Sequence, residues 1–134
     1  MSRVLALVVA MLLVLAGPAM ADGGVIEQLR LGVPEPHREL WLQAEASSWQ
    51  PWLEQQQGFL GRDLYWDPQR QEGVLLIRWA TREQWKSIPE DEVLRVQALF
   101  EAEVNQALDR VTDAPPLFPL LAEGELLPQA LPAR

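Results

Sequence analysis

Three stretches of the chain carry the hydrophobic patterns of β-strands. The stretch 25–33 alternates apolar and polar side chains from Gln28 to Leu31, and residues 59–66 alternate again, so both stretches are predicted to be strands. In the second stretch the pattern places Phe59 on the face opposite Trp66. Residues 74–79 form a nearly continuous apolar run, which is typical of a strand buried on both faces.

Helical spacing follows the first and third of these strands. Apolar residues spaced by three and four predict a helix over 36–49, and Pro51 should kink it or start a new turn that reaches Gln57. The segment Thr81–Gln84 has the form of a capping box, so a helix should begin directly after the third strand.

A second capping box, Ser87–Glu90, predicts a long helix with an apolar stripe that ends near Leu108 or Asp109. Residues 114–134 are rich in proline and leucine and leave room for a short edge strand within 117–127. The rest of this segment should be frayed.

The predicted order is βαββαβ, which makes the fold class α+β and ferredoxin-like. We expect a four-stranded antiparallel sheet with both helices on one face. Leu75 and Ile77 should face one side of the third strand, and Val74 and Leu76 the other. The uncovered apolar face needs a partner, so we expect a homodimer in which two sheets pack together.

The N-terminus resembles an export signal. Arg3 precedes an unbroken apolar run over 4–16, and cleavage is predicted after Ala21. An uncleaved signal acting as a membrane anchor is the alternative. The domain organisation is therefore a signal peptide over 1–21, one domain over 22–113 and the C-terminal segment 114–134, with the protein exported to a periplasm, a thylakoid lumen or the medium.

The composition of the chain narrows the classes of ligand and metal that it can bind. Without residues 1–21, 10 basic residues face 19 acidic ones, a formal charge of −9, so binding to nucleic acid or to an anionic membrane surface is disfavoured. The chain has no cysteine, which excludes disulfides and thiolate-held metals. His37 is the one histidine, and a lone imidazole in a polar setting is more often a surface residue than a metal ligand.

Three segments in order resemble a known family: Val25–Glu27, Gly58–Gly61 and Ile77–Lys86. Over roughly 25–108 the chain is similar to the dimeric α/β-barrel superfamily, and in particular to a branch known chiefly from cyanobacterial genomes and related to the antibiotic biosynthesis monooxygenase domains. This resemblance implies a site between the sheet and the helices of each protomer.

The resemblance also bears on cofactors. Haem-degrading members of the superfamily use a tryptophan at the position of Trp79, with an asparagine on the first strand and a histidine on the next helix. Here the first strand offers Glu27 and Gln28 instead, and the helix after Trp79 has no histidine. We therefore predict no cofactor, and haem by distant resemblance is not supported.

Six tryptophans fall between residues 41 and 85. They could fill a small core, or they could line a pocket for a flat apolar ligand. For the pocket we single out five residues: Trp79, Trp85, Trp49, Gln28 and Arg30. A second group of polar strand residues could form one charged cluster or ordinary cross-strand ion pairs: Glu27, Arg30, Arg62, Asp63 and Arg78.

Three functions remain open. The first is a non-catalytic exported dimer that binds a small apolar or aromatic molecule. The second is a cofactor-free monooxygenase, in which an electron-rich substrate reacts with oxygen and the protein orients it. The third is a structural or interaction protein that uses the leucine- and proline-rich tail. Because no set of catalytic side chains accompanies the fold, the sequence favours the first.

Overall fold

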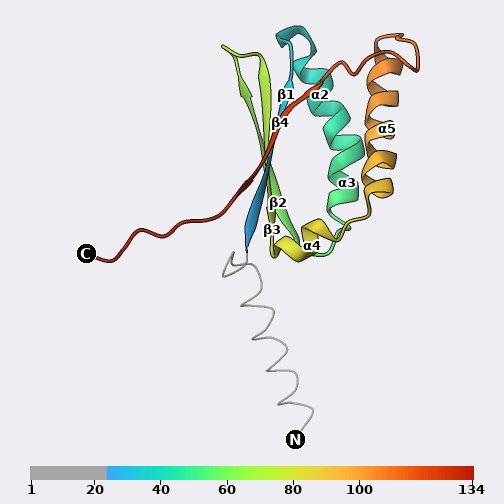
Figure 1. Cartoon of the computed structure of the whole chain (residues 1–134). Helices are drawn as coiled ribbons and strands as arrows, with labels where there is room; N and C mark the ends of the chain where they lie inside the picture. The colour runs from blue at the N-terminus through green and yellow to red at the C-terminus, as the bar shows by residue number, and fades with distance from the viewer. Residues whose placement is uncertain (1–23) are drawn as a thin grey trace, which may run out of the picture.

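A computed structural model describes residues 24–134 of the chain. The predicted signal segment and its cleavage after Ala21 lie outside the described residues. Four strands form one sheet, and the helical segments gather on one of its faces (Figure 1). The strands are β1 (Val25–Gly32), β2 (Phe59–Asp67), β3 (Glu72–Trp79) and β4 (Leu120–Leu126).

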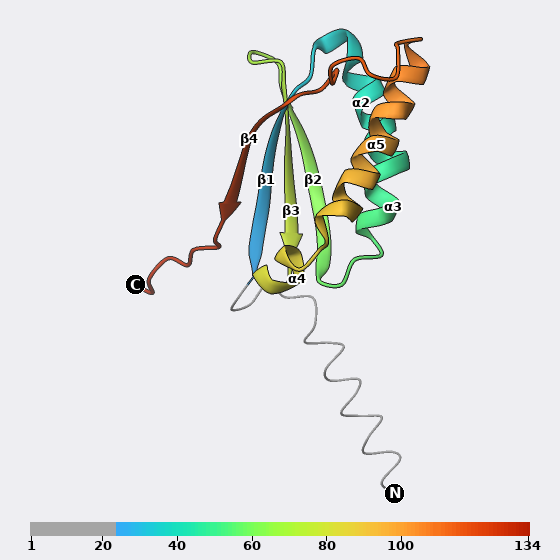
Figure 2. The same ribbon diagram turned by 45° about the vertical axis from the view of Figure 1, so that its right-hand side comes forward.

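The sheet has the order β2-β3-β1-β4, and every neighbouring pair is antiparallel. With the helices on one face, this arrangement confirms the predicted ferredoxin-like α+β fold (Figure 2). β4 lies at an edge beside β1, within the segment where a short edge strand was expected.

Side chains of β3 alternate between the two faces of the sheet. Leu75, Ile77 and Trp79 are buried on the helix side, whereas Val74 and Leu76 are half-buried on the opposite side. The alternation of Leu75 and Ile77 against Val74 and Leu76 was predicted correctly. No helix of the chain covers the second face, so its predicted burial depends on a second copy.

The first helical segment differs from its prediction. It begins as the 3₁₀-helix η1 (Glu35–His37), continues as α2 (Arg38–Ala44), widens into the π-helix η2 (Glu45–Trp49) and ends as α3 (Gln50–Leu53). Pro51 lies in the first turn of α3, where its missing N–H leaves no regular i to i−4 bond to Ser47. The wider turn accommodates the proline without ending the helix.

A β-bulge changes the predicted faces of β2. The register with β3 shifts between Phe59 and Gly61, and Gly61 adopts a positive φ of 137°. Phe59 therefore pairs with Trp79 and packs edge-on against its ring, 5.9 Å between centroids. It lies on the same face as Trp66, not on the opposite one, because the bulge inserts one extra residue into the alternation.

Two helices follow β3. In α4 (Arg82–Lys86) the backbone N–H of Gln84 donates to the Thr81 hydroxyl at 3.1 Å, which confirms the first capping box. The second capping box was wrong, because α5 (Glu90–Ala107) begins after Pro89 and has no side-chain cap. Its C-terminal end agrees with the prediction.

The core lies between the sheet and the helices. α5 makes its main contacts with η2 and α2, and its buried stripe of Val96, Phe100 and Val104 packs toward them. Trp41 of α2 is buried against β3, where Gly73 leaves room for its ring. Over 24–134, none of the helices combines the length and apolar character that a membrane crossing requires.

Candidate functional site

A cavity of about 910 Å³ lies between the helix-facing side of the sheet and the helices. Its floor comes from β1, β3 and Arg62 of β2, and its walls come from η2, α3, α4, α5, β4 and the loop before β4. Four indole rings line it: Trp49, Trp52, Trp79 and Trp85. A cavity of this size, with apolar walls and a few polar groups, has the properties of a site for a small molecule.

The indoles are held at fixed angles. Trp49 and Trp52 meet edge to face, with their centroids 5.6 Å apart and their planes at 78°. The indole N–H of Trp52 donates to Glu92 of α5 at 3.3 Å, which ties α3 to the start of α5. Edge-to-face packing and this tether fix the shape of the cavity wall.

Glu27 of β1 is a polar residue on the floor of the cavity. Its Oε1 accepts a hydrogen bond from the indole N–H of Trp79 at 3.1 Å. Burial raises the pKa of Glu27 above its usual range. The hydrogen bonds of Trp79 and Trp85 and the charge of Lys86 oppose this shift, while Glu123 of β4 adds to it. The result is a carboxyl group that can hold a proton or accept one from a ligand.

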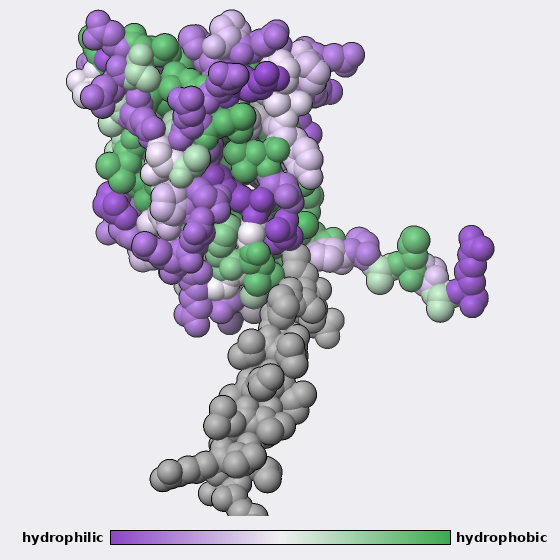
Figure 3. All heavy atoms as spheres, turned by 180° about the vertical axis from the view of Figure 1, so that it is seen from behind, coloured by the Kyte–Doolittle hydropathy of each residue, from purple (hydrophilic) through white to green (hydrophobic). Residues whose placement is uncertain are grey.

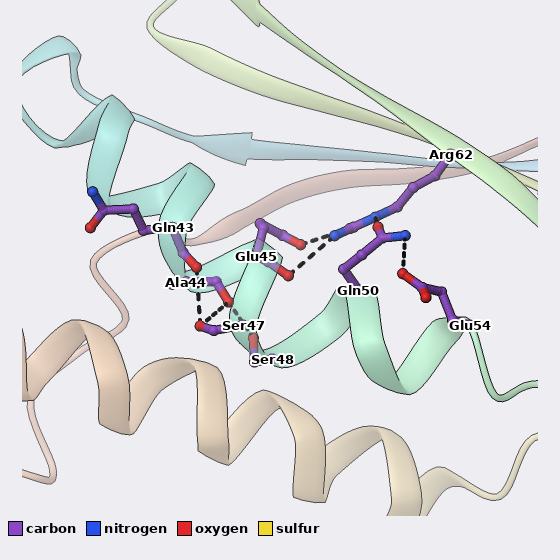
Figure 4. Close-up of polar contacts among 8 residues, drawn as sticks. All are labelled: Gln43, Ala44, Glu45, Ser47, Ser48, Gln50, Glu54 and Arg62. Atoms are coloured by element: carbon purple, nitrogen blue, oxygen red, sulfur yellow. Dashed lines mark hydrogen bonds and ion pairs between the residues drawn. The ribbon is translucent and has the colours of Figure 1, made fainter.

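A buried ion pair lies at the opposite side of the floor (Figure 4). The Arg62 guanidinium of β2 donates to the Glu45 carboxylate of η2 at 2.7 Å, and both side chains are only 3% exposed. Arg62 also donates to the side chain of Gln50 at 2.7 Å and to the backbone carbonyl of Glu45 at 3.3 Å. Burial raises the pKa of Glu45, and the charge of Arg62 opposes the rise.

The π-helix places this pair. Within this segment Ser48 donates from its hydroxyl to the Ala44 carbonyl at 2.6 Å, as Figure 4 shows. Three of the five guanidinium N–H groups of Arg62 are used within the chain. The other two belong to a buried side chain that lines the cavity.

Arg62 and Glu27 lie in one row across the sheet. Both pair with Ile77, Arg62 from β2 and Glu27 from β1, so their backbones are separated by two strand spacings, about 10 Å. The floor therefore offers a donor at one side, an acidic group at the other, and an apolar residue between them. A flat molecule can lie over Ile77 and reach both.

The five residues predicted for the pocket divide between the two faces of the sheet. Trp79, Trp85 and Trp49 line the cavity. Gln28 and Arg30 do not, because they pair with Leu76 and Val74 and so lie on the opposite face. The error has a simple cause, since neighbouring residues of a strand point to opposite faces.

The predicted charged cluster is also divided. Arg30 pairs with Glu72 at 3.2 Å and Arg78 with Asp63 at 2.5 Å, both on the uncovered face. Glu27 and Arg62 lie on the helix-facing side. The uncovered face thus carries ordinary cross-strand ion pairs, and the cavity carries the two buried groups.

The remaining candidates do not contribute to the cavity. His37 lies at the end of η1 and is not among the residues that line it. Within residues 24–134, no three histidine, aspartate or glutamate side chains are grouped so that they could hold a metal ion.

Comparison with known proteins rests on structure. No family model matches the chain, and no match was found among curated proteins. A Streptomyces coelicolor monooxygenase from the gene ActVA-Orf6, in complex with nanaomycin D, aligns with a TM-score of 0.53 and 14% identity over 83% of this chain and 92% of that one. A Bordetella bronchiseptica protein assigned as an antibiotic biosynthesis monooxygenase aligns with a TM-score of 0.54 and 16% identity over 81% of this chain and 100% of that one.

The chain has the fold of these monooxygenases. At such identities the likeness concerns the path of the backbone, and it agrees with the resemblance that the sequence indicated. The function must be argued from the cavity itself.

Sequence reasoning did not single out Trp52, Glu45, Lys86 or Glu123, and it left the inward position of Arg62 open. A usable signal was present for Arg62 and for Glu27. In the series Val25, Glu27, Leu29 and in the series Arg62, Leu64, Trp66, one charged residue interrupts an otherwise apolar face. Such an interruption marks a buried polar group.

Proposed function

We propose that the protein binds a small, flat, largely apolar or aromatic molecule in the cavity between the sheet and the helices. The observation that carries this proposal is the cavity of about 910 Å³ with four indoles on its walls. A space filled only by core side chains would not leave such a volume open. The two free N–H groups of Arg62 and the carboxyl of Glu27 would orient the molecule.

A titration followed by tryptophan fluorescence tests the proposal. Menadione is a suitable flat aromatic probe, and saturable quenching is the expected result. Trp79→Phe should weaken binding of menadione about fivefold or more, because it removes part of the cavity wall and frees Glu27. Trp66→Phe is the matched control, since Trp66 does not line the cavity and donates instead to the Val33 carbonyl. Absence of saturable quenching across flat aromatic probes would refute the proposal.

Oxygenation of the bound molecule is the second candidate function. It is supported by the monooxygenase fold neighbours and by the acidic group that Glu27 offers inside the cavity. Glu27 would accept the proton of a phenol, and the electron-rich phenolate would react with O2 at a ring carbon. The ring would be oxidised to a quinone that keeps one oxygen atom of O2, and the other oxygen atom would leave as water, so no cofactor is required. Oxygen uptake with hydroquinone-type substrates, lost in Glu27→Gln but not in the exposed-site variant Glu39→Gln, is the expected result. Binding without oxygen uptake would leave only the first function.

We further propose that the chain is exported and that it acts as a homodimer. The apolar run before Ala21 supports export, and the uncovered apolar face of the sheet supports the dimer. Mass spectrometry of the protein recovered outside the cytoplasm should give a chain that begins at Asp22. An intact N-terminus would instead indicate the anchored form.

A further inference from the structure

Negative charge exceeds positive charge around the cavity. Five carboxylates and two cationic side chains line it, a formal balance of −3. Arg62 and Glu45 neutralise each other in their buried pair. The excess therefore belongs to the other four carboxylates, with Lys86 as the single cation among them: Glu27, Glu90, Glu101 and Glu123. A negatively charged ligand would be repelled by this lining.

Lys86 shows where a positive charge is held. Its ammonium lies over the ring of Trp85, 3.9 Å from the centroid, in a cation–π contact at the cavity wall. The same charge acts on Glu27, whose pKa it lowers. Lys86 is exposed and long, and it lies at the last position of the short helix α4. A side chain of this kind can leave the ring at little cost when another cation arrives.

Glu27 has few partners for a carboxylate that faces a cavity. The indole N–H of Trp79 donates to one of its two oxygens, and Trp85 is a second donor that acts on it, whereas a carboxylate can accept about four hydrogen bonds. Glu123 faces it from β4 with the same sign of charge, and burial further disfavours its ionised form. An ammonium group beside Glu27 would supply both the missing charge and the missing donors.

We propose that the ligand of this cavity is an organic amine, whose ammonium group takes the place of Lys86 between Glu27 and the ring of Trp85. The inference rests on the proposed function, because it names the class of molecule that the cavity binds. The apolar body of the amine would lie over Ile77 and Leu29, against the remaining indoles. The glutamates that line the cavity would thus help to recognise the ligand. The acidic surface as a whole keeps the protein soluble.

Three probes that share one aromatic body test the proposal: 2-naphthylmethylamine, 2-naphthylmethanol and 2-naphthoate. At about pH 8 they carry positive, zero and negative charge. Isothermal titration calorimetry should show the amine binding about tenfold more tightly than the alcohol, and the carboxylate weakest of the three.

Two variants separate the site from the general charge of the protein. Glu27→Gln should lower the affinity for the amine about fivefold or more and the affinity for the alcohol by less than that, because the amide keeps a hydrogen-bonding group and removes the charge. Glu39→Gln removes the same charge from an exposed position that does not line the cavity, and it should change neither affinity. Lys86→Met should tighten amine binding, because it removes the competing ammonium.

The results separate the amine proposal from the proposed binding function. If the alcohol binds and the amine shows no preference, the amine proposal is overturned while the proposed binding function stands. The amine proposal is also overturned if Glu39→Gln weakens amine binding as much as Glu27→Gln does, because general charge would then explain the preference. If none of the three probes binds, both proposals fail.

Discussion

At the scale of single residues, Arg62 and Glu45 form an ion pair that is almost completely buried. Each side chain is 3% exposed, so each charge depends on the other and on the bonds that Gln50 and the η2 backbone supply. Desolvation of two charges consumes most of the attraction between them, so the pair itself adds little net stability. Removal of one partner is costly, because it leaves a buried charge without compensation.

A double-mutant cycle measures this dependence. Arg62→Met alone should lower the free energy of unfolding by about 3–5 kcal/mol, and the double variant Arg62→Met with Glu45→Leu should recover most of that loss. Urea unfolding gives the values. As a control, Arg95→Gln breaks the exposed pair with Glu92 and should cost less than about 1 kcal/mol. Equal losses for Arg62→Met and Arg95→Gln would show that the Arg62 pair is not buried in solution.

Glu27 makes a second prediction, which concerns pH. Its pKa is raised above the ordinary value of 4.5, chiefly by burial, so the folded chain holds this proton more tightly than the unfolded chain. The stability that this provides is complete below pH 4.5 and is lost as the pH rises through the folded-state pKa. The groups that face Glu27 are Trp79, Trp85, Lys86 and Glu123.

Glu27→Gln removes the titration. Its free energy of unfolding, compared with that of the natural chain, should therefore improve by on the order of 1 kcal/mol between about pH 5 and about pH 8. Urea unfolding at the two pH values checks this, with Glu39→Gln as the exposed carboxylate control. A difference that stays constant, or that moves in favour of the natural chain as the pH rises, contradicts a raised pKa at Glu27.

At the scale of elements, the strand β3 shows how one small residue allows a helix to lie close to the sheet. A Cβ added at Gly73 would approach the Trp41 ring to 2.7 Å, closer than side chains tolerate. Gly73→Ala should lower the free energy of unfolding by about 1–3 kcal/mol, measured by urea unfolding. Gly124→Ala in β4 is the matched control, because its nearest neighbour would lie 3.9 Å away, and it should be close to neutral.

The sequence predicted the elements better than their interior details. Strand and helix positions, the Thr81 cap and the face of Leu75 and Ile77 follow from local periodicity, and the structure has them. The bulge at Gly61 and the π-turn before Pro51 each add one residue to a regular period. A constant period does not reveal such insertions, because each one shifts the repeat by one residue without interrupting the element.

Reliance on a regular period caused more errors in the predicted site than in the predicted fold. Assignment of Gln28 and Arg30 to the cavity was an error of one residue in β1, which reverses the face of every side chain. The buried position of Glu45 depends on the π-turn, so no regular helical pattern indicates it. Trp79 and Trp85 were placed by family resemblance, and the structure brings both to the cavity wall.

At the scale of the whole molecule, the exposed apolar face of the sheet is the surface that a second copy would cover. Apolar side chains interrupt the polar surface in several places when the molecule is viewed from behind (Figure 3). The side of the sheet away from the helices carries Val74, Leu76 and Tyr65, of which Tyr65 is 56% exposed. The edge strand β4 adds Leu126, which is 40% exposed. Burial of such a face against an identical face is favourable, and a two-fold axis makes it self-complementary.

We therefore expect the chain without residues 1–21 to have twice the monomer mass by light scattering at micromolar concentration. Leu76→Glu should convert it to a monomer, because the variant places a carboxylate and its symmetry mate in an apolar contact. Leu42→Glu is the matched control: Leu42 is 43% exposed but belongs to α2, on the helix side. A monomer in the natural chain, or a dimer that survives Leu76→Glu but not Leu42→Glu, would show that the sheet face is not the interface. Because the cavity lies on the opposite side of the sheet, the Leu76→Glu monomer should still bind aromatic probes within about threefold of the natural affinity.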